Sequence, residues 1–311
     1  MHQNRRHFLK TTVTAAAGGM LVPLAEIKAS ELPFVKAKPG YELVFMATSW
    51  GYDGSIEDFC DLAKKDGYEG VELGWPGSDL KTQERMFAAL KKNNLQFGFL
   101  CGAGEHDSNQ HLSSFIKYID AAIDNSFQKP LFINCHSGKD YFTFEQNKQI
   151  IDYTVKKAKS SGVPIYHETH RGRMLYAAPI ARNFIEKCPE LRITLDISHW
   201  CVVHESLLGN QKETIAMVLD RVDHIHSRVG HSEGPQVSDP RAPEWSDALN
   251  AHLAWWDQVV ERKKRKGERM TILTEFGPAD YMPTLPYTRQ PVADQWGINV
   301  FMMNLLRKRY Q

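Results

Sequence analysis

Four acidic or histidine side chains stand at the ends of four apolar segments in the second half of the chain. They are Glu168 in VPIYHETH, Asp196 in LRITLDISHW, His226 in RVDHIHSRVG and Glu275 in RMTILTEFG. The gaps between them are 28, 30 and 49 residues, and the first two match the length of one strand-plus-helix unit. Three carboxylates and one imidazole that met at a common point would bind a hard or borderline divalent cation.

Short apolar runs that alternate with helical segments are the elements that would bring these residues together. The runs are Glu42–Thr48, Gly70–Trp75, Gln96–Gly102, Pro130–Cys135, Val163–His170, Arg192–Ser198, Val222–Val229 and Met270–Phe276. Segments between them, such as SIEDFCDLAKKDG and QERMFAALKKNN, carry apolar residues at three- and four-residue spacing and end at Gly or Asn, as helices do. Eight such units predict an α/β fold with a single (β/α)8 TIM barrel, whose strands end on one common face. No GxGxxG follows the first run, which argues against a dinucleotide-binding sheet.

The alternation of side chains along a strand indicates which residues point into the barrel. Glu168, Asp196 and Glu275 each fall on an inward face, and so do both His224 and His226. We select His226 as the ligand because it lies nearer the mouth, and we expect His224 to be a deeper, hydrogen-bonded residue. Any one of these acids alone could equally be a helix cap or a loop ion pair.

The combination of these ligand types predicts the cofactor. Buried carboxylates need a cation or a paired charge, and three of them converging without one would repel each other strongly. We therefore expect Glu168, Asp196, His226 and Glu275 to hold one divalent metal. Among manganese, magnesium, cobalt and zinc, a carboxylate-rich set favours the first three over a structural zinc, which prefers Cys and His; manganese is our first choice.

At these four positions the chain resembles the xylose-isomerase-like barrels of the sugar phosphate isomerase/epimerase superfamily. That family carries Glu, Asp, His and Glu at the ends of strands five to eight, and its D-x-x-H pattern is matched here by DISH, which ends at His199. The resemblance implies that Glu168 and Glu275 are the catalytic acid–base pair on either side of a ketose. It also implies that His199 holds a substrate oxygen, although His199 could instead only cap the following loop.

The loops after two of the strands depart from the ketose epimerases of that family. Those enzymes carry an Asn-Arg pair after the fifth-strand Glu and Gly-Glu followed by Arg after the seventh-strand His, whereas this chain has ETHRGR and HSRVGHSEGPQ. Here Arg171, Arg173, Arg228 and His231 would replace the usual substrate contacts, either to balance charge or to bind an anionic or heavily hydroxylated substrate. Further candidate substrate contacts are Glu72, Trp75 and His136, each at or near a strand end; each could instead be a packing or hydrogen-bonding residue of the barrel mouth.

The first thirty residues read as an export signal rather than as part of the barrel. Asn4-Arg5-Arg6-His7-Phe8-Leu9-Lys10 is a twin-arginine pattern, and the small-residue-rich TTVTAAAGGMLVPLA follows it, a stretch too short to span a membrane. We expect a signal peptide over residues 1–30, cleavage near Ala29 or Ser30, and a barrel over residues 31–311. The expected partner is the twin-arginine export machinery, the expected location is the periplasm, and no stable membrane anchor is expected.

The composition of the chain limits which classes of partner are expected. The chain has 38 basic and 37 acidic residues and a net charge of +1, so nothing indicates a nucleic-acid partner. The cysteines are odd in number, form no CxxC pair and do not predict a disulfide framework. The sequence leaves the oligomeric state open, and a homo-oligomer is one possible assembly.

These observations predict a metal-dependent isomerase or epimerase that removes a proton beside the carbonyl of a non-phosphorylated sugar or sugar derivative. The alternative is a lyase that starts from the same proton abstraction and then cleaves a keto-glycoside by elimination. A phosphodiesterase like endonuclease IV is a third hypothesis, disfavoured by the neutral charge. A non-catalytic sugar-binding protein would leave the paired glutamates unexplained.

Overall fold

The computed structural model of this chain describes residues 36–311. The predicted signal segment, its cleavage site and the first residues of the predicted barrel domain lie outside the described residues. Lys36–Gln311 forms one compact unit. Within this unit no helix is both long enough and apolar enough to cross a lipid bilayer.

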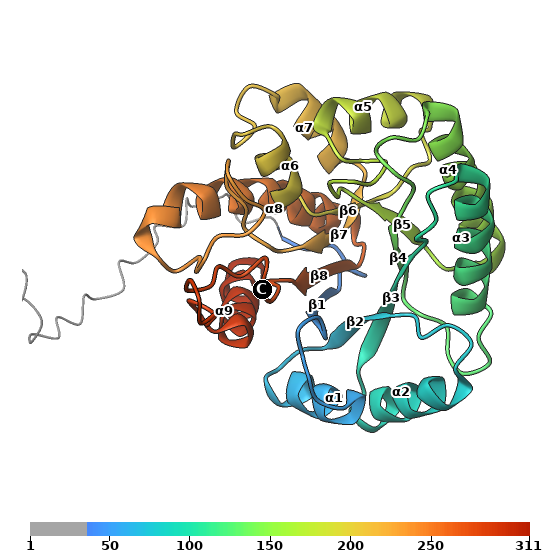
Figure 1. The fold of residues 1–311 in the computed structure, drawn as a ribbon, viewed down its shortest axis with the longest axis horizontal. Coiled ribbons are helices and arrows are strands. Elements are labelled where there is room, and N and C mark those ends of the chain that lie inside the picture. Colours follow the sequence, from blue (N-terminus) through green and yellow to red (C-terminus); the bar gives the residue numbers. More distant parts are fainter. Residues whose placement is uncertain (1–35) are drawn as a thin grey trace, which may run out of the picture. The chain divides into compact units, whose positions relative to one another are not determined.

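Eight parallel strands form a closed barrel in sequence order, β1 to β8, as predicted (Figure 1). The strands are β1 Leu43–Thr48, β2 Gly70–Gly74, β3 Gln96–Gly102, β4 Ile133–His136, β5 Ile165–Glu168, β6 Ile193–Leu195, β7 Val222–His226 and β8 Met270–Thr274. The ring closes between β1 and β8, where Met46 is in register with Leu273. Because every strand runs the same way, all eight carboxyl ends lie at one end of the barrel.

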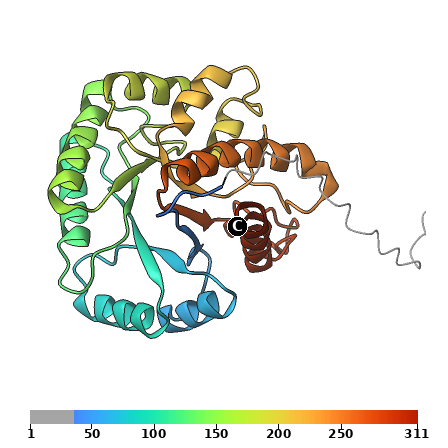
Figure 2. The ribbon, with the colours of Figure 1, turned by 180° about the vertical axis from the view of Figure 1, so that it is seen from behind.

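Helices surround the ring of strands on its outside (Figures 1 and 2). They are α1 Ile56–Lys65, α2 Leu80–Lys92, α3 Ser108–Ile123, α4 Phe144–Ser161, α5 Ala178–Lys187, α6 Ser198–Val203, α7 Lys212–Leu219, α8 Ser246–Lys266 and α9 Gln295–Tyr310, with a 3-10 turn at Pro243–Trp245. Local sequence explains their ends. Thr143 and Gln146 form a capping box at the start of α4, and Gly162 ends that helix in the left-handed conformation.

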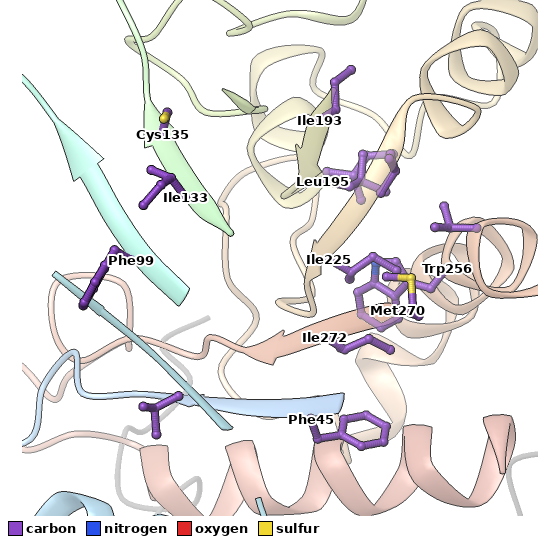
Figure 3. Close-up of a cluster of buried hydrophobic side chains, with 14 of the residues drawn as sticks. Phe45, Phe99, Ile133, Cys135, Ile193, Leu195, Ile225, Trp256, Met270 and Ile272 are labelled. Carbon is purple, nitrogen blue, oxygen red and sulfur yellow. The ribbon is translucent and has the colours of Figure 1, made fainter. Parts of the chain in front are cut away.

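The apolar core has two parts, one on each side of the barrel wall. The larger part lies between strands and helices; Figure 3 shows some of it, including Trp256 of α8 and strand residues such as Phe45 and Ile272. The smaller part is formed by Val44, Met46, Phe132 and Leu273. By the alternation of β1 and β8 these side chains point into the barrel, so they close its lower interior beneath the strand ends.

The observed strands are shorter at several ends than the predicted runs. β5 ends at Glu168 rather than at His170, and β6 ends at Leu195 rather than at Ser198. In β6 the cause is local, because the Asp196 carboxylate accepts a hydrogen bond from the backbone N–H of Ser198 at 3.2 Å. This bond turns the chain out of the strand and into α6.

Candidate metal centre and active-site cavity

The four predicted ligands meet at the carboxyl end of the barrel. Glu168 and His226 are the last residues of β5 and β7, whereas Asp196 and Glu275 directly follow β6 and β8. All four are buried, and one ligand atom from each lies within 4.8 Å of the others. The predicted convergence of four residues that are far apart in the sequence is therefore confirmed.

The imidazole of His226 is oriented as a metal ligand requires. Its Nδ1 lies 3.0 Å from Glu275 Oε2 and 3.8 Å from Glu168 Oε2, so this nitrogen faces the other ligands. Its Nε2 lies 3.3 Å from Glu72 Oε1. A proton held on Nε2 by Glu72 leaves the Nδ1 lone pair free for a cation, which is the usual carboxylate–histidine–metal arrangement.

The same histidine balances charge when no cation is bound. Burial alone would lower the pKa of His226, but the carboxylates of Glu275, Glu168 and Glu72 raise it well above its ordinary value. The protonated ring would then carry one positive charge among three carboxylates. A divalent cation would take over that role and displace the Nδ1 proton.

Arg228 lies against two of the ligands. Its side chain is buried, its Nη2 contacts Asp196 Oδ2, and its Nη1 lies 3.7 Å from Glu275 Oε2. Burial raises the pKa of Asp196 to about 6, helped by the nearby Glu275 and Glu168 charges and opposed by Arg228. A carboxylate has lone pairs for both a guanidinium and a cation, so Arg228 can share Asp196 with a bound metal.

The donor set therefore fits a divalent cation: three carboxylates and one suitably oriented imidazole nitrogen, within reach of one another. Two further groups at the same end of the barrel also have ligand spacing and share residues with it. They are Glu72 with His224 and His226, and His136 with Glu168 and His170. The predicted position of His224 below the mouth is confirmed, because its Nδ1 lies 2.7 Å from Thr271 Oγ1 inside the barrel.

Glu168 is held as an anion by several hydrogen-bonding neighbours. Its Oε2 accepts from Asn134 Nδ2 at 3.0 Å and lies 3.1 Å from His136 Nε2. Burial alone would raise the pKa of Glu168, but the neighbouring His136 and His226 lower it well below its ordinary value. A buried, ionised carboxylate next to open space can act as a general base.

A cavity of about 390 Å³ opens over this centre. It is lined by Thr48, Ser49, Trp50, Glu72, Gly74, Leu100, His136, Glu168, His170, Arg173, Arg228, Glu275 and Tyr281. Two of the four ligands, Glu168 and Glu275, thus face a space large enough for a small molecule. A larger cavity, about 520 Å³, lies near the opposite ends of the strands, among residues such as Leu131, Pro164 and Arg192, and holds none of the ligand residues.

The predicted substrate contacts fall into three groups. Glu72, His136, Arg173 and Arg228 line the cavity. His199 is buried and does not line it; its Nε2 lies 2.9 Å from Arg228 Nη2 and 3.4 Å from Asp196 Oδ2. This position lets His199 orient Arg228 and Asp196.

Three predicted contacts, Arg171, Trp75 and His231, lie outside the cavity lining. The guanidinium carbon of Arg171 lies 5.2 Å from the ring centre of Tyr281. Trp75 is a core residue that packs edge-on against Phe99, with ring centres 5.0 Å apart. His231 packs against Trp245, with ring centres 4.7 Å apart, in the segment between β7 and α8.

The cavity residues that the sequence-based prediction did not include are Thr48, Ser49, Trp50, Gly74, Leu100, His170 and Tyr281. The Tyr281 ring lies 4.6 Å from the Arg228 guanidinium carbon, and Trp50 meets Tyr281 edge-on at 4.9 Å. Asn134, which bonds Glu168 from below, was also missed. Asn134 could have been found, since it shares the inward face of β4 with His136.

No protein-family model matches this sequence, and no curated protein is significantly similar to it. Solved structures are similar over most of the chain. One is D-allulose 3-epimerase from Methylomonas sp. in complex with D-allulose, with 13% identity, a TM-score of 0.54, and coverage of 89% of this chain and 100% of the other. A second is a probable 3-DHS dehydratase from Bacillus anthracis, with 14% identity, a TM-score of 0.55, and coverage of 85% and 98%.

A third is a xylose isomerase domain protein from Alicyclobacillus acidocaldarius, with 13% identity, a TM-score of 0.52, and coverage of 86% and 98%. At such identities the similarity establishes the barrel fold that these proteins share with the chain. It agrees with the fold expected from the sequence.

Proposed function

We propose that this protein is a divalent-metal-dependent isomerase or epimerase that moves a proton beside the carbonyl of a non-phosphorylated sugar or sugar derivative. The observation that carries the proposal is the convergence of Glu168, Asp196, His226 and Glu275 within 4.8 Å, at the floor of a cavity. The similarity in fold to a D-allulose 3-epimerase supports the choice of a carbohydrate as substrate.

The two glutamates that reach the cavity are the proposed proton carriers. A divalent cation held by the four ligands would polarise a substrate carbonyl and stabilise negative charge that develops on its oxygen. Glu168, kept ionised by His136 and His226, would remove a proton from the carbon beside that carbonyl. Glu275, which directly follows β8, would return a proton from the other side, as epimerisation requires.

Two further groups would position the substrate during this transfer. Arg228 lines the cavity and contacts Asp196, so its guanidinium can hold a substrate oxygen close to the centre. The buried His199 supports Arg228, with its Nε2 2.9 Å from Arg228 Nη2. The aromatic rings of Trp50 and Tyr281 flank the same space and can cover the apolar face of a sugar while limiting access of water.

A lyase that cleaves a keto-glycoside is the second candidate, and one feature of the cavity favours it. His136 and His170 line the cavity beside Glu168, with their ring centres 4.8 Å apart. After proton loss beside the carbonyl, an oxygen substituent on the next carbon could leave and take a proton from a protonated His136. Burial lowers the pKa of His170 to about 4, so His170 would orient the leaving group rather than protonate it. The similarity in fold to a probable dehydratase is compatible with such an elimination.

Solvent exchange tests the shared first step of both candidates. Purified protein with and without manganese would be incubated with free ketoses and with keto-glycosides in heavy water, and deuterium uptake would be followed by NMR. We expect uptake at a carbon beside the carbonyl only with metal, and its loss in Glu168→Gln and Glu275→Gln, whereas Glu186→Gln on the outer helix α5 would behave as the wild type.

The products distinguish the candidates, because an epimeric sugar indicates the first and a released aglycone indicates the second. The proposal would be refuted by a folded, metal-loaded protein that exchanges no carbon-bound proton in any of these substrates.

A further inference from the structure

Three cations that the proposed reaction does not use lie on the loops beside the cavity. Arg173 lines the cavity itself. Arg171 lies with its guanidinium carbon 5.2 Å from the ring centre of Tyr281, another lining residue. Lys139 lies within electrostatic range of Arg173. All three belong to the loops that follow β4 and β5, beside the strand that carries Glu168.

No carboxylate pairs with these three cations in the described part of the chain. Within residues 36–311, none of Lys139, Arg171 and Arg173 forms an ion pair with a carboxylate, whereas even exposed residues such as Arg85 and Arg182 do so. Burial lowers the pKa of Lys139 and the neighbouring Arg173 charge lowers it further, while Glu105 and Asp140 partly offset this. Like charges held close together at a partly buried site repel each other, and an anion bound there would relieve that repulsion.

The two loops that carry these charges are built as one fixed unit. The backbone N–H of Met174 donates to the Ser137 carbonyl at 3.0 Å and joins the loops. The buried Asn147 side chain donates to the Lys139 carbonyl at 3.0 Å and holds the first loop. Gly138 has a φ of +60°, and a Cβ there would lie 2.0 Å from Asn147 Oδ1, so this tight packing requires glycine.

The three cations are not needed to neutralise the negative charge of the metal ligands. Arg228 already contacts Asp196 and approaches Glu275 below the cavity. No ion pair joins Arg171 or Arg173 to those carboxylates among the described residues, and both arginines are only partly buried. A neutral sugar would be bound by hydroxyl contacts and would not require unpaired cations at this rim.

We propose that Lys139, Arg171 and Arg173 form a subsite for an anionic substituent, so that the substrate is an acidic sugar such as a uronate or a sulfated sugar. The guanidinium plane matches a carboxylate or sulfate through paired N–H donors. An anion bound there would place the rest of the sugar over Glu168 and Glu275. This inference rests on the proposed function for the identity of the reacting centre, but not for the binding of the anion.

Binding of three probes to the full-length, manganese-loaded protein tests the subsite. The probes are D-glucuronate, D-glucose 6-sulfate and neutral D-glucose, measured by calorimetry. We expect at least one acidic probe to bind about tenfold or more tightly than glucose, as a charge-assisted contact implies, and its affinity to fall as salt rises. Carboxylate and sulfate are distinguished by which acidic probe binds better.

Substitutions test whether the preference for the acidic probe depends on Lys139 and Arg173. Arg173→Met and Lys139→Met are expected to weaken the binding of the acidic probe by about tenfold and to leave the affinity for glucose unchanged. Arg173→Lys is expected to retain part of the preference for the acidic probe. Arg85→Met, on the outer helix α2, serves as the matched control. Equal affinity for glucose and both acidic probes, or an unaltered preference in Arg173→Met, overturns the subsite.

An error in the proposed reaction can be distinguished from an error in the proposed anion subsite. Glu168→Gln should abolish deuterium exchange while keeping the preference for the acidic probe. Wild-type protein that prefers the anion through Arg173 but never exchanges a proton would refute the proposed reaction and leave the subsite standing.

Discussion

Glu72 connects the two histidines of the barrel interior to the candidate metal centre. Its carboxylate lies 3.1 Å from His224 Nε2 and 3.3 Å from His226 Nε2, and it is buried. Burial alone would raise the pKa of Glu72, but His226 and His224 bring it down to about 2. The ionised group therefore fixes the tautomer of His226 from behind and directs the Nδ1 lone pair toward the other ligands.

Removal of this charge should weaken metal binding without removal of a ligand. Glu72→Gln keeps the side-chain volume but replaces the acceptor, so we expect the affinity for manganese to fall by roughly 10- to 100-fold, as for other carboxylates behind a ligating histidine. Competition with a chelating dye would measure it. The matched control, Glu186→Gln, changes an exposed residue of α5 that pairs with Arg182; an unchanged affinity in Glu72→Gln would contradict the role assigned to this carboxylate.

At the scale of single residues, the sequence predicted the centre better than its surroundings. Glu168, Asp196, His226 and Glu275 were found because charged residues at the ends of apolar runs are unusual in a buried strand. Tyr281 was not found, because it lies in a loop where no periodicity indicates direction. The interior role of Glu72 was also missed, since alternation gives its face but not its partner.

At the scale of elements, the eight strands and the helices between them were predictable because two periodicities alternate along the chain. The ends were less predictable. The run Val163–His170 continues past the last strand residue, Glu168, because His170 and Thr169 are compatible with either a strand or a loop. Hydrogen bonds that the Asp196 carboxylate accepts from Ser198 in the following turn decide where β6 stops, and such bonds depend on side-chain conformation rather than on residue type.

An ion-pair cluster at the other end of the barrel joins neighbouring elements. Asp223 of β7 lies 2.5 Å from Arg192 Nε, just before β6, and also contacts Lys263 of α8. Although burial raises the pKa of Asp223, the hydrogen bond from Arg192 and the charge of Lys263 lower it overall. We expect Asp223→Asn to reduce the free energy of unfolding by about 2 kcal/mol at pH 7, because the buried Lys263 and the partly buried Arg192 lose a shared partner.

The pH dependence of this loss follows from the lowered pKa. The stabilisation by Asp223 is complete above the ordinary aspartate pKa, about 3.9, and it is lost as the pH falls through the lower pKa of the folded state. The difference between wild type and variant in urea unfolding should therefore shrink below about pH 4. Asp152→Asn, which breaks an exposed pair with Lys148, should change stability by less than about 0.5 kcal/mol; an equal effect of both variants would refute the assignment.

At the scale of the whole molecule, the barrel divides its tasks between its two ends. The end where strands finish carries the candidate ligands and the cavity above them, while ion pairs such as Asp223–Arg192 join neighbouring elements at the end where strands begin. Export by the twin-arginine route and a periplasmic location stay predictions from residues 1–30. That route would suit a barrel that takes up its metal before transport, and it favours sugars without phosphate as substrates.

Metal binding by four strand ends should be visible in the stability of the whole barrel. Glu168, Asp196, His226 and Glu275 come from β5, β6, β7 and β8 or the residues just after them, so an ion that binds only the folded chain stabilises all four strands together. At free manganese one hundredfold above its dissociation constant, the free energy of unfolding should rise by about 2.7 kcal/mol. For a barrel of this size this corresponds to roughly 5–10 °C in Tm, measured by calorimetry with manganese against excess chelator. The same shift in Tm, measured within each variant, should disappear in Glu168→Gln and Asp196→Asn. It should persist in the control Asp152→Asn. A wild-type Tm that is identical with metal and with chelator would exclude a metal centre at this site.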